Sequence, residues 1–159
     1  MAITLKAGDK APSFVGMDQH GKKVDLKDLK GKNVILYFYP KDDTPGCTKE
    51  SCNLRDNYEF WQSKNYEVIG VSPDDEASHQ KFINKYNLPF TLLADTEKKI
   101  MSDYGTYGEK NMYGKKVMGV IRTTFVINEN GVIAEVFKRP KVDEHTEQIT
   151  KALEKSGAL

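Results

Sequence analysis

The chain has 159 residues, of which 38% are hydrophobic and 30% are charged. This length and composition predict a single folded domain over residues 1–159 and exclude a disordered chain. The 24 Lys and Arg nearly balance the 23 Asp and Glu, so no overall charge favours nucleic acid or anionic lipid. No segment approaches the ~20 apolar residues of a membrane span and no signal peptide is evident, so we predict a cytoplasmic protein.

The first part of the chain predicts short extended segments followed by one central strand. Residues 8–26 are expected to form extended pieces around a turn at residues 19–22. Residues 33–39 form a continuous apolar and aromatic run, which is typical of a strand covered on both faces. Pro40 ends this strand, because proline has no N–H to donate to a neighbouring strand.

Helix and strand patterns alternate in the middle of the chain. A long helix is predicted from about residue 44 to residue 64, with Thr44 as its N-cap and Pro45 in its first turn. Further predicted elements are a strand at 67–72, a helix at 76–86, a strand at 91–94 and a helix at 96–104. Residues 105–119 are predicted to be a loop region containing Gly and Tyr.

The C-terminal part predicts a hairpin and a final helix. Apolar runs at 123–127 and 132–137 flank the turn at 128–131, which contains Asn-Gly, a strong hairpin signal. The last helix is predicted at 144–155, with Ile149 and Leu153 facing inward. The alternation indicates an α/β protein with a central mixed sheet flanked by helices.

Cys47 lies after an aromatic strand and within the first turn of the predicted helix. Unpaired N–H groups and the positive end of the helix dipole stabilise an anion there, so we expect more thiolate, the form that attacks peroxides. Asp42 and Asp43 act in the opposite direction, and the sequence does not decide which effect is larger. A buried, inert cysteine is the alternative interpretation.

Cys52 follows five residues later on the same predicted helix. A regular helix separates the Cα atoms of residues i and i+5 by roughly 8–9 Å, whereas a disulfide needs less than ~7 Å. If both cysteines react in one cycle, the start of the helix must therefore unwind. Metal binding is a weak rival, because the cysteines and His20, His79 and His145 lack zinc-ligand spacing. His79 is expected on a helix surface, and no metal or other cofactor is predicted.

The segment from Tyr37 to Cys52 closely resembles the peroxiredoxins, and within them the bacterioferritin-comigratory-protein or peroxiredoxin Q group. It contains the specific pattern Pro-x-x-x-Thr-x-x-Cys, which ends at Cys47. The likeness extends over nearly the whole chain, including residues 8–12, 70–74, 78–82, 88–90, 109–115 and 122–125. It implies a thioredoxin-like fold with an N-terminal extension, and peroxide reduction with cysteine as the only redox centre.

The resemblance implies roles for residues around the two cysteines. Cys47 is expected to be the peroxidatic cysteine and Cys52 the resolving cysteine. Pro40 would shield the thiolate from water, although on its own it only ends a strand. Thr44 would hydrogen-bond the peroxide oxygens, with a plain helix cap as the alternative.

Two charged residues complete the expected site. Arg122 would stabilise the thiolate and the charge that develops on the leaving oxygen. Taken alone, Arg122 is better interpreted as a surface arginine at a strand edge. Glu50 is expected to orient Arg122, with an exposed helical glutamate as the alternative.

The expected activity is an antioxidant thiol peroxidase that reduces hydrogen peroxide and organic hydroperoxides. Its cycle would pass through a sulfenic acid and an intramolecular disulfide, which thioredoxin or a similar dithiol protein would reduce. We expect a monomer without a nucleic-acid or membrane partner. Two other classes remain open: a thiol–disulfide oxidoreductase acting on proteins, and a non-enzymatic holdase or interaction domain.

Overall fold

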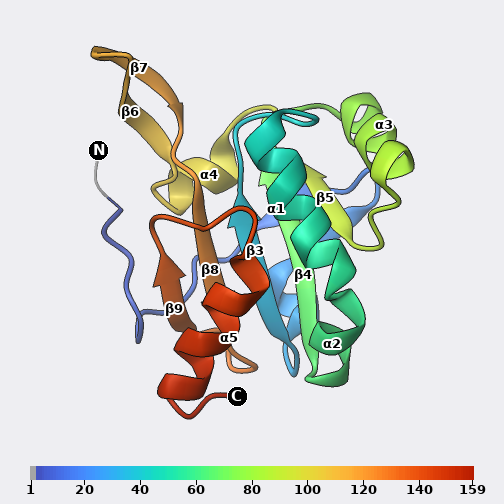
Figure 1. Cartoon of the computed structure of the whole chain (residues 1–159), viewed down its shortest axis with the longest axis vertical. Helices are drawn as coiled ribbons and strands as arrows, with labels where there is room; N and C mark the ends of the chain where they lie inside the picture. The colour runs from blue at the N-terminus through green and yellow to red at the C-terminus, as the bar shows by residue number, and fades with distance from the viewer. Residues whose placement is uncertain (1–2) are drawn as a thin grey trace.

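The computed structural model describes residues 3–159 as a central sheet with helices on both faces (Figure 1). The sheet has the strand order β5–β4–β3–β8–β9. Strands β3, β4 and β5 are parallel, whereas β8 is antiparallel to both of its neighbours. The strands are β3 (Asn33–Phe38), β4 (Tyr66–Ser72), β5 (Thr91–Ala94), β8 (Thr123–Ile127) and β9 (Ile133–Phe137). This confirms the predicted mixed sheet.

Strand β3 lies at the centre of the sheet and supplies side chains to both of its faces. Val34, Leu36 and Phe38 join one apolar cluster, and Ile35 and Tyr37 join the other. All five side chains are buried. This two-sided burial is the reason that the segment reads as a continuous apolar run instead of an alternating one.

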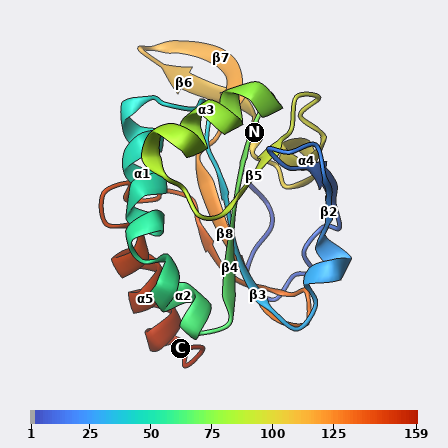
Figure 2. The same cartoon turned by 90° about the vertical axis from the view of Figure 1, so that its right-hand side faces the viewer.

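The two faces of the sheet carry different elements (Figure 2). Leu54, Trp61, Phe82 and Leu153 come from four helices and share one apolar cluster with Tyr37. These helices are α1 (Pro45–Asp56), α2 (Tyr58–Ser63), α3 (Glu76–Tyr86) and α5 (His145–Lys155). The opposite face carries β1 (Val15–Met17), β2 (Lys23–Asp25), the 3-10 helix η1 (Leu26–Leu29) and α4 (Lys99–Asp103).

The single helix predicted from residue 44 to residue 64 is interrupted at Asn57. Helix α1 ends at Asp56 and α2 begins at Tyr58. The Asn57 side chain donates to the Asn53 carbonyl (2.8 Å), while its backbone N–H turns to the Leu54 carbonyl (3.3 Å). An asparagine side chain thus replaces a backbone hydrogen bond of the helix and ends it.

The loop predicted over residues 105–119 is wrong, because most of it forms a hairpin. Strand β6 (Tyr107–Met112) pairs antiparallel with β7 (Lys115–Val120). The turn residues Tyr113 and Gly114 both have positive φ angles, 54° and 78°. This is the geometry of a two-residue hairpin turn that is usually built from Asn-Gly. The strands lack a clear apolar alternation, which hid them from pattern analysis.

The helix predicted over residues 96–104 is shorter than expected. Helix α4 covers only Lys99–Asp103. The Asp95 carboxylate accepts hydrogen bonds from the backbone N–H groups of Ile100 (3.2 Å) and Met101 (2.9 Å), and it thereby replaces the missing first turn.

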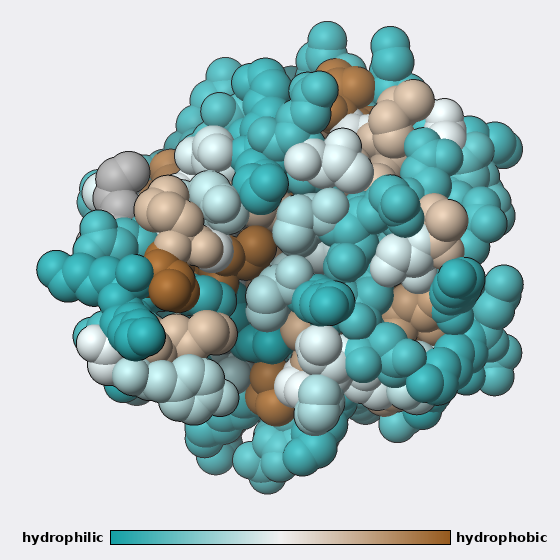
Figure 3. Space-filling model, turned by 90° about the horizontal axis from the view of Figure 1, so that it is seen from above, coloured by the Kyte–Doolittle hydropathy of each residue, from teal (hydrophilic) through white to brown (hydrophobic). Residues whose placement is uncertain are grey.

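The end of the molecule that carries the N-terminus of α1 is mostly hydrophilic (Figure 3). Apolar side chains at this end occur singly or in small groups. Within residues 3–159, every helix is too short or too polar to cross a membrane.

Gly70 of β4 leaves no room for a side chain between two buried neighbours. A Cβ atom there would lie 2.7 Å from Leu92 Cδ2 and 2.8 Å from Tyr37 Cζ. Replacement by alanine is therefore expected to lower the free energy of unfolding by about 1–3 kcal/mol, measured by urea denaturation. Gly119→Ala is the matched control, because its Cβ would meet the flexible end of Lys110 at 2.9 Å. Equal losses in the two variants would contradict this account.

Candidate active site

Cys47 is the third residue of α1 and is fully buried. The strand β3 and the loop after it lead directly into the N-terminus of α1. Pro45 occupies the first position, where the absence of an N–H costs nothing. The N–H groups of the first turn, together with the helix dipole, give this sulfur a positive surrounding.

Arg122 contacts the sulfur from the segment between β7 and β8. Its Nη2 donates to Cys47 Sγ over 3.1 Å, and its Nη1 donates to Glu50 Oε1 over 2.8 Å. A Cβ atom at Gly46 would lie only 3.3 Å from Nη2, so glycine leaves the space that the guanidinium occupies. Arg122 thus links two residues of α1 that are one helical turn apart.

Glu50 and Arg122 are not the surface residues that the alternative interpretations described. Glu50 is fully buried, and the Arg122 side chain is 24% exposed. Burial raises the pKa of Glu50 to about 7, although the charge and the hydrogen bond of Arg122 oppose this shift. Burial acts to lower the pKa of Arg122, but Glu50 and Cys47 outweigh it and the net shift is upward. Arg122 therefore keeps its positive charge beside the sulfur.

Thr44 occupies the N-cap position but makes no capping hydrogen bond. Its hydroxyl donates to the Lys41 carbonyl over 2.8 Å. The expected cap position is confirmed, whereas the capping bond is absent. Because the hydroxyl proton is engaged, the oxygen is left with its acceptor lone pairs. Pro40 is half-buried and is the second residue of the loop that leads from β3 to Thr44.

The two acidic residues of this loop are paired with groups outside it. Asp43 accepts hydrogen bonds from Lys85 Nζ (2.7 Å) and the Tyr86 hydroxyl (2.6 Å), and these bonds lower its pKa. Asp42 accepts from the Tyr39 hydroxyl (2.6 Å) and from His79 of α3. The charge of Asp43 is therefore partly offset by Lys85, and that of Asp42 by the His79 ring.

His79 is fully buried, so its predicted position on a helix surface is wrong. Its Nε2 lies 2.9 Å from the Leu93 carbonyl, and its Nδ1 lies 2.7 Å from Asp42 Oδ2. A carboxylate and a carbonyl are both acceptors, so this geometry favours a proton on each ring nitrogen, that is, the imidazolium form. Burial acts to lower the pKa of His79, but Asp42 and the Leu93 carbonyl raise it overall.

One carboxylate oxygen each of Asp42 and Asp74 and one ring nitrogen of His79 lie within 4.8 Å of one another, close enough to be tested as a metal site. The His79 ring has no free lone pair for a metal ion, because each nitrogen donates a hydrogen bond. This cluster is an ion pair that attaches the loop before α1 to α3. The i, i+3 and i+7 spacing of His79, Phe82 and Tyr86 is the signal that places the histidine on the inner helix face.

Cys52 lies on α1 and is partly exposed, and both cysteines are free thiols. Burial is the main cause that raises the pKa of the Cys52 thiol. Its neighbours fasten α1: the Tyr37 hydroxyl bonds Ser51 Oγ (2.8 Å), and Asn53 Oδ1 accepts the Thr146 N–H (2.7 Å). With α1 regular from residue 45 to residue 56, the two cysteines are too far apart to bond.

His145 is the residue at this site that the sequence interpretation missed. It begins α5, is fully buried, and its Nε2 lies 3.6 Å from Glu50 Oε2. His145, Ile149 and Leu153 follow at i, i+4 and i+8 and share the buried face of α5. That spacing points the histidine inward and is the signal for its position.

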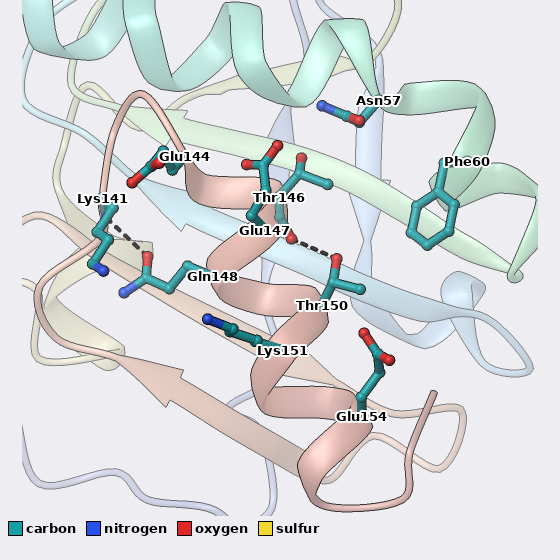
Figure 4. Close-up of a pocket in the computed structure, with 10 residues that line it drawn as sticks. All are labelled: Asn57, Phe60, Lys141, Glu144, Thr146, Glu147, Gln148, Thr150, Lys151 and Glu154. Carbon is teal, nitrogen blue, oxygen red and sulfur yellow. Dashed lines mark hydrogen bonds between the residues drawn. The ribbon is translucent and has the colours of Figure 1, made fainter.

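A groove between α2 and α5 is lined by ten residues, among them Gln148, the hydrogen-bond partner of His145 (Figure 4). Its ten lining residues include Phe60 and a mixture of lysines, glutamates and uncharged polar side chains. None of them is a cysteine, and none belongs to the predicted site. We assign no chemistry to this groove.

A buried thiol at a helix N-terminus, contacted by an arginine beside a mixed sheet, defines a cysteine-dependent redox enzyme. Residues 7–136 match the family model described as AhpC/TSA. The chain belongs to this family and, within it, to the bacterioferritin-comigratory-protein or peroxiredoxin Q group of peroxiredoxins. It is therefore a thiol-dependent peroxidase.

Two curated relatives support this placement. The chain is 48% identical over 151 residues to a putative peroxiredoxin Bcp from Coxiella burnetii, covering 95% of this chain and 100% of the relative. It is 42% identical over 151 residues to peroxiredoxin Bcp from Bacillus subtilis, covering 95% of this chain and 96% of the relative.

Solved structures confirm the thioredoxin-like fold. A Xanthomonas campestris peroxiredoxin Q structure has a TM-score of 0.84 and 32% identity, covering 92% of each chain. A Xylella fastidiosa peroxiredoxin Q variant has a TM-score of 0.90 and 29% identity, covering 98% of this chain and 99% of that one. A further similar structure is that of the Xanthomonas campestris bacterioferritin comigratory protein, which was studied for alkyl peroxide reduction (TM-score 0.84, 31% identity, 92% of each chain).

The His79 ion pair is expected to make stability depend on pH. Because the pKa of His79 is raised in the folded state, its contribution is complete below the ordinary value of about 6.5 and is lost as pH rises through the raised pKa. In urea denaturation, the difference in unfolding free energy between the wild type and His79→Gln should therefore shrink as pH rises above about 6.5. His20→Gln, at an exposed position, should show a constant difference. A constant difference for His79→Gln would contradict the imidazolium assignment.

Proposed function

We propose that Cys47 is the peroxidatic cysteine and that its thiolate attacks the terminal oxygen of a hydroperoxide. The observation that carries this proposal is the 3.1 Å hydrogen bond from Arg122 Nη2 to a buried sulfur at the helix start. In this step a sulfur–oxygen bond forms, the oxygen–oxygen bond breaks, and Cys47 becomes a sulfenic acid. The leaving oxygen takes a proton from solvent and departs as water or an alcohol.

The residues around Cys47 stabilise charge, bind the peroxide and limit the access of water during this step. Arg122 stabilises the thiolate and then the charge on the leaving oxygen, because a fixed cation needs no reorganisation during the reaction. The Thr44 oxygen accepts the hydrogen bond of the peroxide hydroxyl, since its own proton is held by the Lys41 carbonyl. Pro40 limits the access of water, and Glu50 holds the guanidinium in place through the 2.8 Å bond.

We propose that Cys52 resolves the sulfenic acid as an intramolecular disulfide. The sulfur–sulfur bond forms as the hydroxyl group leaves with a proton as water, so the first turns of α1 must unwind. Unwinding of these turns breaks the hydrogen bonds from Arg122 to Glu50 and Cys47. If α1 unwinds as far as Ser51, the hydrogen bond between Tyr37 and Ser51 is also broken. The partial burial of Cys52 raises the pKa of its thiol, and unwinding would remove this cause.

A dithiol protein such as thioredoxin then reduces the disulfide by two thiol–disulfide exchanges. Its two thiols supply the two electrons that the peroxide consumed, and they leave as a disulfide. Both cysteines lie on one helix of one chain, which supports a cycle carried out by a monomer. A dithiol reductant of this kind agrees with the cytoplasmic location that we predict. The proposed substrates are hydrogen peroxide and organic hydroperoxides.

Substitution of each cysteine tests these roles separately. Cys47→Ser is expected to abolish the peroxide-dependent oxidation of thioredoxin, because the reacting sulfur is missing. Cys52→Ser should still consume one equivalent of hydrogen peroxide per chain, but thioredoxin should no longer recycle it. Normal turnover of Cys52→Ser with thioredoxin would show that another group resolves the sulfenic acid.

Arg122→Lys tests the forked contact while it keeps the positive charge. A lysine cannot donate to Cys47 and Glu50 with a planar fork, so the rate constant for oxidation by hydrogen peroxide should fall by roughly 10²-fold. Stopped-flow mixing of the reduced protein with peroxide measures this constant. Arg139→Lys, on an exposed loop, serves as the control and should react like the wild type. A similar rate constant in both variants would remove the proposed role of the fork.

A further inference from the structure

One oxygen of the buried Glu50 carboxyl group has no hydrogen-bond partner. Oε1 accepts from Arg122, but Oε2 is completely buried and unpaired. Among the residues that the structure describes, it is the one buried side-chain nitrogen or oxygen atom in this condition. A buried acceptor without a partner is costly, so its neighbourhood indicates what it binds.

The polar atom that faces Glu50 Oε2 is His145 Nε2, at 3.6 Å. The other ring nitrogen, Nδ1, lies 3.0 Å from Gln148 Oε1. That oxygen also accepts the Lys141 N–H (2.8 Å), which identifies it as the amide carbonyl. The ring proton is therefore on Nδ1.

His145 Nε2 is consequently an unprotonated acceptor in the neutral ring. The Thr124 hydroxyl donates to it over 2.8 Å. Two proton acceptors, Glu50 Oε2 and His145 Nε2, thus face each other in a fully buried space. A proton bound to Oε2 would give this oxygen a partner, because the O–H could donate to Nε2 once the Thr124 hydroxyl turns its own proton away from that single lone pair.

The charges around Glu50 favour such a proton near neutral pH. Burial raises the pKa of Glu50 to about 7, and burial together with the charge of Arg122 lowers the pKa of His145 to about 4, with Gln148 opposing. The other titratable groups facing Glu50 are Cys47 on α1 and Tyr37 on β3. Arg122 is the cation that bridges Cys47 and Glu50, so a thiolate and a carboxylate would share one positive charge.

We propose that Glu50 and His145 form a buried proton-holding pair that keeps Glu50 neutral while Cys47 is a thiolate. The pair binds one proton from solvent between Oε2 and Nε2. The positive charge of Arg122 then stabilises the Cys47 thiolate without competition from a second anion. Both are positioning residues, because they act through Arg122 and do not touch the peroxide. This inference rests on the proposed role of Cys47.

Loss of the proton from the pair places a second anion beside Arg122 and weakens its hold on the thiolate. The rate constant for oxidation by hydrogen peroxide should therefore fall above about pH 7. The falling limb belongs to the pair as a unit, because two strongly interacting groups titrate together.

Glu50→Gln is the decisive variant for this falling limb. Its amide oxygen still accepts from Arg122, and its amide N–H can donate to His145 Nε2, so it imitates the protonated pair. In stopped-flow single-turnover measurements between about pH 5 and about pH 9, the limb should be present in the wild type and absent in Glu50→Gln. Glu154→Gln makes the same chemical change at an exposed position of α5 and should keep the wild-type profile. A falling limb that persists in Glu50→Gln would overturn the proposal.

His145→Phe tests the other member of the pair. Phenylalanine keeps a ring against Phe137, whose own ring centre is 6.0 Å away, but it removes both nitrogens. The falling limb should move to lower pH by about one unit, because neutral Glu50 loses its acceptor. An unmoved limb would show that His145 takes no part.

Infrared spectroscopy of the resting protein supplies a readout that needs no peroxide. A band of a buried protonated carboxyl should be present in the wild type near pH 6, disappear above neutral pH and be absent from Glu50→Gln. Lack of this band in the wild type would overturn the pair even if His145→Phe failed to fold. If the band is present but Cys47 does not react with peroxide, the pair stands and the proposed function fails.

Discussion

The forked guanidinium of Arg122 is the contact on which the candidate site depends. It joins the start of β8 to the first turns of α1 by donating to Cys47 and Glu50. The sheet makes this possible, because β3 and β8 are antiparallel neighbours, and the end of β3 and the start of β8 therefore lie at the same edge. Gly46 leaves the space for the fork. A cation, a thiol and a carboxylate are thus brought together by backbone topology before any substrate binds.

In the acidic loop before α1, the two carboxylates that would destabilise a nearby thiolate are hydrogen-bonded to other groups. Asp43 is bonded by α3 through Lys85 and Tyr86, and Asp42 is bonded by the His79 imidazolium. These contacts give the loop a fixed path and give its carboxylates partners of their own. The same residues that repel an anion in the sequence therefore serve in the structure as anchors for the segment that delivers Cys47.

The sequence predicted the mixed sheet, the central strand and the position of Cys47 at a helix start, because each has a strong local pattern. It failed where tertiary partners decide the outcome. His79 looks like a polar helix residue until Asp42 supplies its counter-charge. Asn57 is a different case, because its side chain ends the helix through a local bond to Asn53 that the apolar pattern does not reveal. The contact between Glu50 and Arg122 was expected from family resemblance alone, because 72 residues separate them and no local spacing encodes the pairing.

The interruption at Asn57 limits how far disorder can travel along this part of the chain. In the proposed cycle α1 must open, yet α2 begins a separate run of hydrogen bonds with Trp61 held in the apolar cluster. In a continuous helix, the unwinding of α1 could extend to the residues around Trp61. Because the two helices are separate, the first turns of α1 can unwind and re-form in each cycle while Trp61 of α2 stays packed in the apolar cluster.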